Sequence, residues 1–370
     1  MTIGTEHEFS INSRNFTPLP VSDEIIRSIC GSYAGEILFG DVNIGKELQK
    51  TVLEFVPKTP SDTVAGLERQ LVQGIAKFHH IFHERYTLLG LGMHPTLTLD
   101  QTSLWDHGEK EYYETYDRIF NIRQHGWLNV QALQINLSYA SEKDLVTQYN
   151  RIRALLPYLV AVTAASPVVE GALGPACDNR LRFYRANQEK IPVICNGIIP
   201  KAIDRIADYR RLEGEIFTEL KKYGGEILCE EWVNSAGLIV RSSRRCLEIR
   251  ALDEQECIRS DMAVCAFVRA LLRCRRLDLP DDRKTLLALL EVAVRNGTAA
   301  IRPELDRLYT AAWDHATADE RQYLPVIRER ITHGSLAELI RKRLEAGSPL
   351  NSLLLELSSC LYENRPFLQD

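Results

Sequence analysis

Two glutamates near the start of the chain have the spacing of a metal site. Glu6 and Glu8 stand two positions apart in a strand-like run over residues 1–10. In an extended strand, alternate side chains share a face, and a rise of ~3.3 Å per residue would place these carboxylates about 6.5 Å apart. Oxygens at that separation can share or bridge divalent cations. The solvated face of an edge strand would show the same pattern, so both interpretations stay open here.

A second polar face follows in the strand-like run over residues 128–138. Gln134 and Asn136 fall on one side together with Ala132 and Ser138, while the residues between them are apolar. One side would then pack, and the other would face water or a ligand. Side-chain amides both donate and accept hydrogen bonds, which suits a small zwitterion or a phosphate. A sheet with one solvated face is the alternative.

An acid and a base stand side by side late in the chain. Glu248 and Arg250 share a face of the predicted strand over residues 245–252, and Asp253 follows at its end. The pair is either a surface ion pair or a metal-binding carboxylate beside a phosphate-binding guanidinium, as in phosphoryl-transfer sites.

Two further residues are candidates on weaker patterns. Glu54 is an acid within an apolar strand, and it is favoured over Glu47 because a seven-residue separation puts the two on opposite faces unless a bulge intervenes. His94 shares strand parity with Gly90 and Gly92, which would clear space for a ligand beside the imidazole. A histidine before proline can equally be an ordinary turn residue.

The segment from Gly40 to Lys46 has the spacing of a phosphate-binding loop, G-x-x-x-x-G-K. The hydroxyl residue that should follow the lysine is Glu47, which offers the metal no hydroxyl and repels phosphate. This motif is therefore rejected.

Hydrophobic periodicity predicts an α+β fold. Strand-like stretches at 2–10, 47–56, 85–93, 128–138, 238–242 and 245–252 favour one strongly curved, antiparallel, six-stranded sheet. Helix-like stretches lie at 21–33, 62–85, 108–123, 141–165, 201–223 and 255–276, and the pattern beyond is almost all helical. We predict a single catalytic domain over residues 1–370, with an α+β core over 1–255 covered by helices and a helical part over 256–370 packed on it.

Composition narrows the class of protein. The 370 residues are 45% hydrophobic and 26% charged, with a formal net charge of −5. Since no basic block stands apart from acidic neighbours, nucleic acid is not the expected partner. Nine cysteines without a C-x-x-C pair predict reduced thiols. With no signal-like start and no apolar run near 18 residues, we expect no membrane partner and a cytoplasmic location.

Six motifs, in order along the chain, resemble those of the second glutamate–cysteine ligase family, which groups plant and proteobacterial γ-glutamylcysteine synthetases with bacterial carboxylate–amine ligases. They are Gly4-Thr-Glu6-His-Glu8-Phe9, Leu53-Glu54-Phe55, Gly92-Met-His94-Pro95, Gln134-Ile-Asn136-Leu-Ser138, Ser166-Pro167 with the preceding helix, and Leu247-Glu248-Ile-Arg250-Ala-Leu-Asp253. Ser138 stands where the plant motif has aspartate, and the segment around Arg180 follows its motif only loosely.

The resemblance implies a glutamine-synthetase-like sheet that holds ATP and Mg²⁺. It implies an acyl-phosphate intermediate captured by an amine, with glutamate and cysteine as the default substrates. A homodimer is implied as well. By the same resemblance, the metal ligands are Glu6, Glu8, Glu54 and Glu248, the residues that neutralise phosphate or a substrate carboxylate are Arg250, Arg241 and Arg180, and the residues that hold ATP or substrate are Gln134, Asn136 and His94.

Two other functions stay open. A related phosphotransferase would stop after phosphorylating a carboxylate or a guanidinium, and it would release ADP without an amine. A non-catalytic nucleotide-binding regulator would keep the scaffold alone. The presence of all four carboxylates and Arg250 argues against the regulator.

Overall fold

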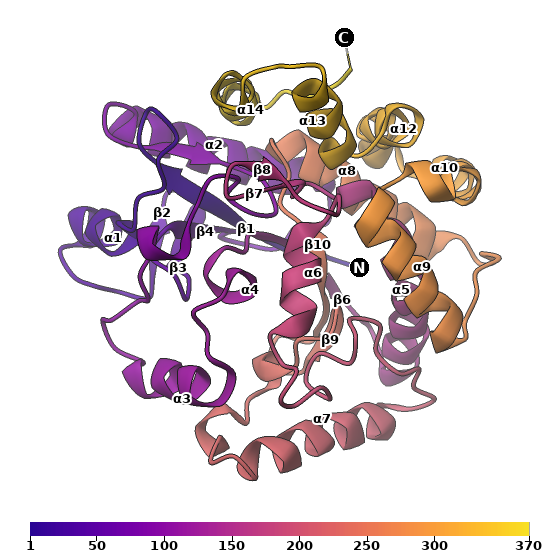
Figure 1. Ribbon diagram of the computed structural model, residues 1–370. Helices are drawn as coiled ribbons and strands as arrows, with labels where there is room; N and C mark the ends of the chain where they lie inside the picture. The colour runs from indigo at the N-terminus through magenta and orange to yellow at the C-terminus, as the bar shows by residue number, and fades with distance from the viewer. Residues whose placement is uncertain (370) are drawn as a thin grey trace.

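The computed structural model describes residues 1–369 and is built on an eight-stranded antiparallel sheet in the order β2-β3-β4-β1-β6-β10-β9, with β5 also paired to β1 (Figure 1). The strands are β1 (Ile3–Asn12), β2 (Glu36–Phe39), β3 (Val42–Lys46), β4 (Val52–Pro57), β5 (Thr87–Leu89), β6 (Ala132–Ser138), β9 (Leu238–Arg241) and β10 (Cys246–Asp253). A small separate hairpin joins β7 (Val168–Val169) to β8 (Ala172–Leu173).

The antiparallel α+β class predicted from the sequence is confirmed, but the strand number is corrected from six to eight. All six predicted strands are present, although β4 begins only at Val52 and β5 is three residues long. The two missed strands, β2 and β3, form a hairpin over the segment considered as a phosphate loop. Val42 and Ile44 do alternate with Asn43 and Gly45, but the run is short, and asparagine, aspartate and glycine are depleted in strands. The rejection of the phosphate loop is confirmed, because Gly45 is a paired strand residue.

Strand β1 divides the molecule into two sides. Ile3, Phe9 and Ile11 are fully buried on the side that packs against helices. Glu6 and Glu8 project to the opposite side, as the period of two requires. Glu8 lies opposite Glu54 of β4, so the register brings acids of neighbouring strands together.

Strand β10 carries a β-bulge. Ile249 pairs with Ile135 of β6, whereas Leu252 pairs with Leu133, so three steps along β10 match two along β6. Arg250 and Ala251 occupy the extra position. Bulges of this kind re-aim side chains next to functional sites.

Helices cover both faces of the sheet (Figure 1). Those before β9 are α1 (Ser22–Cys30), α2 (Val64–Phe82), α3 (Lys110–Phe120), α4 (His125–Leu128), α5 (Glu142–Thr163), α6 (Asn179–Ala186) and α7 (Ile206–Lys221), with the short helices η1 (Leu99–Gln101), η2 (Glu226–Leu228) and η3 (Glu231–Val233). The Ser141 hydroxyl accepts from the Asp144 N–H and caps α5, as a helix start there requires. Helices α2 and α5 pack on the apolar face, and α6 lies on the acidic side.

The chain after β10 is helical, as predicted. Its helices are α8 (Ile258–Arg273), α9 (Arg283–Asn296), η4 (Ala299–Ile301), α10 (Arg302–His315), α11 (Ala318–Arg321), α12 (Leu324–His333), α13 (Leu336–Glu345) and α14 (Leu350–Glu363). Apolar residues of α8, α9, α10 and α12 share one buried cluster with the sheet and α5. None of the helices described in residues 1–369 has the length and apolarity to cross a membrane. All nine cysteines are free thiols, and seven are buried.

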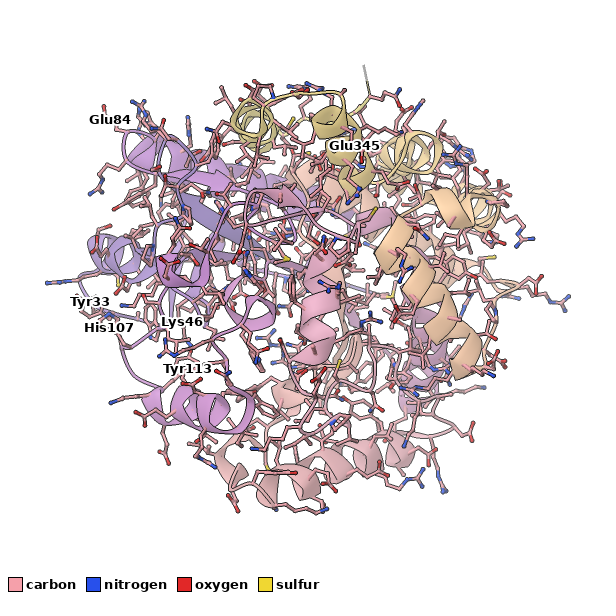
Figure 2. The ribbon with its side chains drawn as sticks, in the orientation of Figure 1. Tyr33, Lys46, Glu84, His107, Tyr113 and Glu345 are labelled. Atoms are coloured by element: carbon pink, nitrogen blue, oxygen red, sulfur yellow. The ribbon has the colours of Figure 1, made fainter. Side chains whose placement is uncertain are left out.

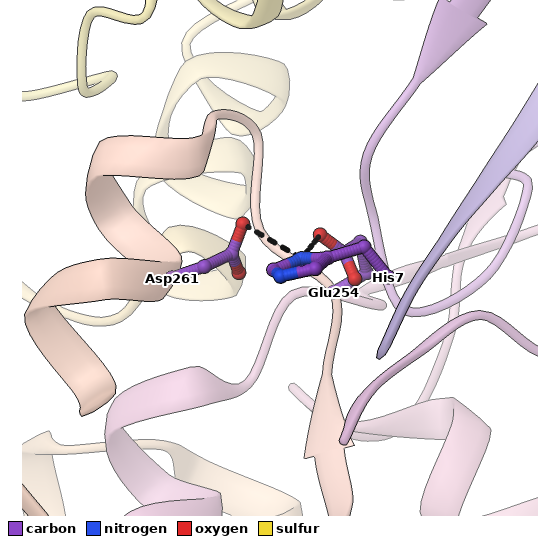
Figure 3. Close-up of side chains that lie close together, drawn as sticks. All are labelled: His7, Glu254 and Asp261. Carbon is purple, nitrogen blue, oxygen red and sulfur yellow. Dashed lines mark hydrogen bonds and ion pairs between the residues drawn. The ribbon is translucent and has the colours of Figure 1, made fainter. Parts of the chain in front are cut away.

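Behind β1 lies a group of buried charges that we call the rear cluster: His7, Glu254 and Asp261 (Figure 3). His7 Nδ1 lies 3.0 Å from Glu254 Oε1 and 3.6 Å from Asp261 Oδ2. Burial alone would lower the pKa of His7, but the two carboxylates outweigh it and raise that pKa to about 10. Glu254 also accepts from the Glu8 N–H at 3.2 Å. The rear cluster therefore anchors β1 to the start of the helical part.

Candidate active site

Carboxylates from three strands lie on one face of the sheet. Glu6 and Glu8 project from β1, Glu54 from β4 opposite Glu8, and Glu248 from β10 opposite Asn136 of β6. Directly opposed residues on antiparallel strands have Cβ atoms about 4.5–5.5 Å apart and share a face. The structure thus brings together all four residues predicted as metal ligands.

The two predicted amides on β6 bind these acids directly. Gln134 Nε2 donates to Glu8 Oε1 and Asn136 Nδ2 donates to Glu6 Oε1, both at 3.1 Å. The Ala132 N–H donates to Glu8 Oε2 at 2.8 Å. Neutral donors orient the carboxylates without neutralising them, so the negative charge of the face remains available to a cation.

Like charges crowd at the centre of this face. Burial first, and then the Glu47 carboxylate, raise the pKa of Glu8 to about 8. The pKa of Glu54 is raised well above its usual value by burial and by its three carboxylate neighbours. The backbone of Gly45 faces Glu54, where an added Cβ would lie only 3.0 Å from Glu54 Oε2. We call Glu6, Glu8, Glu47 and Glu54 the site cluster.

Glu47 is the acid that sequence reasoning ranked too low. Its odd separation from Glu54 assumed one continuous strand, but the chain leaves β3 after Lys46 and turns before β4 begins at Val52. Glu47 therefore enters the same cavity as Glu8. Burial and Glu6 raise its pKa to about 7, although Lys46 opposes the shift. The only sign of this placement in the sequence is the break near Lys50, which separates Glu47 from the strand that carries Glu54.

Glu248 differs from the site cluster because arginines pair with it. It is fully buried, with Arg241 Nη1 at 2.7 Å from Oε2 and Arg250 Nε at 3.1 Å from Oε1. Arg250 Nη1 also donates to the carbonyls of Trp232 and Asn234. The two predicted arginines and Glu248 thus form one buried unit at the β10 end of the face. Sequence reasoning missed Arg244, which contacts Glu6 from the turn between β9 and β10.

Arg180, a predicted substrate residue, lies on α6 and is 2% exposed. Its Nε donates to Asp253 Oδ1 at 2.6 Å, and Ser166 Oγ donates to Asp253 Oδ2 at 2.8 Å, so the guanidinium is held from behind. Its Nη2 is buried and has no hydrogen-bond partner among residues 1–369. An unsatisfied buried donor on a charged group is costly.

A cavity of about 330 Å³ is lined by Arg180 and by two of the acids, Glu8 and Glu47. Its floor includes Glu8, Glu47 and Gln134, and its opposite wall is aromatic. The wall residues Tyr113, Tyr116, Trp127, Tyr184 and Trp232 come from α3, α4, α6 and η3. A second cavity of about 350 Å³ shares Lys46, Tyr113, Tyr116 and Trp232 with the first and continues toward the surface. Sequence reasoning missed this wall, because nothing local in those helices indicates that they face the sheet.

His94 lies away from the acidic face, in the turn after β5. It is buried, its Nε2 is 2.6 Å from Asn12 Oδ1, and its N–H donates to Asn129. Burial lowers the pKa of His94 to about 3, so the ring is neutral. The space expected from Gly92 is filled, since a Cβ there would lie 2.1 Å from the Asp253 carboxyl carbon. In this structure His94 braces the turn rather than lining the site.

The site cluster fits Mg²⁺. Magnesium prefers carboxylate oxygens and keeps several waters, and the raised pKa values show acids that lack a compensating cation. Glu6, Glu8, Glu47 and Glu54 would hold such ions, with Glu248 at the arginine end. A bound divalent cation would neutralise the crowding and polarise phosphate oxygens.

Solved structures place the fold in a known class. The chain aligns with a bifunctional glutathione synthetase from Pasteurella multocida at a TM-score of 0.66 and 15% identity, over 98% of this chain and 52% of that one. It aligns with a glutamate–cysteine ligase from Francisella tularensis, solved in complex with AMP, at a TM-score of 0.61 and 13% identity. This alignment covers 98% of this chain and 88% of that one. The chain also aligns with the ligase PafA, solved in complex with the ubiquitin-like protein Pup, at a TM-score of 0.51 and 9% identity. This alignment covers 96% of this chain and 71% of PafA. The fold is that of glutamate–cysteine ligases and PafA.

Sequence comparison gives the family. The model described as "Glutamate-cysteine ligase family 2" matches residues 2–352, and the chain belongs to this family of ATP-dependent carboxylate–amine ligases. An uncharacterized protein of Archaeoglobus fulgidus is 46% identical over 99% of this chain and 100% of its own length. The chloroplastic glutamate–cysteine ligase of Brassica juncea is 24% identical over 46% of this chain, which spans only 35% of that enzyme.

Proposed function

We propose that this protein is an ATP- and Mg²⁺-dependent carboxylate–amine ligase that uses glutamate as the carboxylate and cysteine as the default amine. The observation that carries the proposal is the crowding of Glu8, Glu47 and Glu54 beside a cavity that Arg180 also lines. Acids that need cations and a buried guanidinium that needs an anion suit a metal–phosphate group and a substrate carboxylate.

Amide formation from a carboxylate and an amine is uphill in water, so the carboxylate oxygen must first become a leaving group. A carboxylate oxygen attacks the γ-phosphorus of ATP, the bond to ADP breaks, and an acyl phosphate forms. The amine nitrogen then attacks the acyl carbon, phosphate leaves with the bonding electron pair, and the nitrogen loses a proton. In this scheme Arg180 holds the substrate carboxylate, Arg250 and Arg241 neutralise phosphate, and the aromatic wall keeps water from the acyl phosphate.

The test is ADP release by purified protein with ATP and Mg²⁺, given glutamate alone, glutamate with hydroxylamine, and glutamate with cysteine or other amino acids. Hydroxylamine captures an acyl phosphate as a hydroxamate. Arg180→Met should raise the KM for glutamate by about 10- to 100-fold, because a charged hydrogen-bond donor is lost. Arg182→Met, on the exposed side of the same helix, is the matched control.

Each outcome has a distinct meaning. Turnover that requires both a carboxylate and an amine supports the ligase. ADP release with glutamate alone and no capture by an amine identifies the phosphotransferase alternative. If ATP is neither bound nor consumed with any pair, the regulator alternative replaces the proposal. The homodimer and the single catalytic domain stay predictions, which light scattering and limited proteolysis would check.

A further inference from the structure

Arg244 is a cation of the acidic face that the proposed mechanism does not use. It stands in the turn between β9 and β10, and its Nη1 donates a hydrogen bond to Glu6 Oε1. The Arg244 side chain is 52% exposed, whereas the Glu6 side chain is 10% exposed. A guanidinium that is half in solvent therefore reaches an acid of the site cluster.

The backbone of this turn is fixed, but the Arg244 side chain is not. Glu231 of η3 accepts from the Ser243 N–H at 3.3 Å and also contacts the Ser243 hydroxyl. The Arg244 N–H donates to the Arg241 carbonyl at 3.2 Å. Among residues 1–369, Glu6 is the one hydrogen-bond and ion-pair partner of the Arg244 guanidinium. The side chain can therefore change partners while the turn stays in place.

The neighbouring arginines are held more firmly. Arg241 pairs with Glu231 at 3.1 Å and with Glu248 at 2.7 Å. Arg250 binds Glu248 and two backbone carbonyls. Their side chains are 12% and 18% exposed, far less than that of Arg244. Because ion pairs of solvent-exposed side chains contribute little to stability, the Arg244 contact is the easiest of the three to exchange.

Glu6 is also a proposed ligand of Mg²⁺, so the metal and Arg244 need the same carboxylate. Its Oε1 already receives two donors, since Asn136 Nδ2 lies 3.1 Å away. A divalent cation that several carboxylates bind at once can displace one guanidinium. Neighbouring oxygens around an octahedral Mg²⁺ lie about 3 Å apart. A phosphate oxygen on the same ion would then be within reach of an arginine that contacts Glu6.

We propose that Arg244 exchanges partners: it holds Glu6 until Mg²⁺ takes that carboxylate, and it then binds a phosphate oxygen of ATP. This inference rests on the ATP and Mg²⁺ sites of the proposed function and adds a positioning residue to them. Arg244 opposes the cation when no nucleotide is bound and stabilises the nucleotide once the cation is in place. The exchange therefore couples the binding of metal and ATP.

The experiment measures binding, so it does not depend on turnover. Mn²⁺ is titrated without nucleotide, with free Mn²⁺ followed by EPR, and ATP is titrated by calorimetry at saturating Mg²⁺ without a carboxylate substrate. Arg244→Met should lower the Kd for Mn²⁺ by a few fold, because a competitor is lost. It should raise the Kd for ATP by about 10-fold, the lower end for a charged hydrogen bond, since Arg244 is half exposed.

Two further variants serve as controls. Arg245→Met removes the same charge from the next exposed position of the turn, and both constants should stay near the wild-type values. Adding Arg244→Met to Glu6→Gln should leave the Kd for Mn²⁺ unchanged, because the competition requires Glu6.

Both shifts are required, and their opposite signs guard against loss of folding. If Arg244→Met changes only one of the two constants, or neither, Arg244 does not exchange partners and the inference fails. An equal response of Arg245→Met would assign the effect to overall charge and would also overturn it. Hydroxamate formation tests the ligase function separately, so its absence would remove that function, whereas the two binding constants decide the exchange.

Discussion

The site cluster and the rear cluster lie on the two sides of β1 and differ in what surrounds their buried acids. In the rear cluster, two carboxylates face the imidazolium of His7, although burial still raises the pKa values of Glu254 and Asp261. In the site cluster, Glu6 contacts Arg244, while burial first and then neighbouring carboxylates raise the pKa values of Glu8, Glu47 and Glu54. Buried charge that is paired serves structure, whereas buried charge left unpaired marks the place where a ligand completes it.

The largest effect is expected from a substitution in the site cluster. Glu8→Gln keeps the shape of the side chain but removes a charge from the centre of the acidic face. We expect kcat to fall by about 10³-fold, or about 4 kcal/mol in the barrier, because phosphoryl transfer depends on correctly placed cations. The rate of hydroxamate formation at saturating substrate measures kcat. Glu84→Gln on the exposed surface is the control (Figure 2), and Glu8→Gln activity within a few fold of wild type would refute the metal role.

Breaking the rear cluster should affect stability instead. His7→Gln leaves two carboxylates buried without their cation, and removing one partner of a buried ion pair costs about 3–5 kcal/mol. We expect a loss of about 3 kcal/mol in the free energy of unfolding, measured by urea denaturation. His80→Gln on the exposed side of α2 should change it by less than about 0.5 kcal/mol. An unchanged midpoint for His7→Gln would contradict the anchoring role.

Both clusters contribute to the pH dependence of stability, because burial raises the pKa of Glu254 as well as those of Glu8 and Glu47. The folded-state pKa values of Glu8 and Glu47, about 8 and 7, exceed their usual 4.5, so the native state binds more protons than the unfolded state in between. Without Mg²⁺, stability should fall as pH rises from about 5 to 8, and Mg²⁺ should restore most of it. His7, with a pKa of about 10 against 6.5, adds stability that is complete below 6.5 and lost toward 10.

Urea denaturation from pH 5 to 9, with Mg²⁺ or with EDTA, distinguishes these contributions. The fall between pH 5 and 8 should respond to Mg²⁺ and flatten in Glu8→Gln. The fall above pH 6.5 that belongs to His7 should ignore Mg²⁺ and disappear in His7→Gln. If Mg²⁺ does not change the slope of stability against pH, the site cluster does not bind Mg²⁺.

The smallest effect tests how closely the site cluster is fitted. Gly45→Ala places a Cβ 3.0 Å from Glu54 Oε2, so Glu54 must shift by a few tenths of an ångström. We expect a several-fold weaker apparent affinity for Mg²⁺, or about 1 kcal/mol. Gly4→Ala is the matched control on the same face, because its Cβ would meet only Asn136 Cβ at an ordinary 3.7 Å. Equal Mg²⁺ titrations for the two variants would show that Gly45 imposes no such constraint.

Much of the site was predictable because it follows strand periodicity. Glu6 with Glu8, Gln134 with Asn136, and Glu248 with Arg250 each share parity within a regular stretch, and antiparallel pairing then brings them together. Periodicity holds only within an unbroken strand, so it failed at Glu47. It also says nothing of distant partners: the aromatic wall, Arg244 and the space around His94 depend on how the chain returns to the sheet.

The predicted fold shows the same limit. The apolar, regularly alternating strands and the long capped helices were found, whereas the β2–β3 hairpin was missed because its strands are short and contain asparagine and glycine. Such a hairpin is held by its pairing to β4 and by the packing of Val42 beneath α2, which are long-range interactions.

The extra residue of the β10 bulge changes which face of the sheet the following side chains point to. Glu248 and Asp253 are five positions apart, and in an uninterrupted strand they would face opposite sides. The bulge at Arg250 and Ala251 resets the alternation, so that one strand supplies both the acid that binds arginines at the floor and the acid that holds Arg180 across the cavity. Deleting Ala251 would turn Asp253 toward the apolar core and release Arg180. A single inserted residue therefore lets one strand fix both Arg250 and Arg180, which line the same cavity.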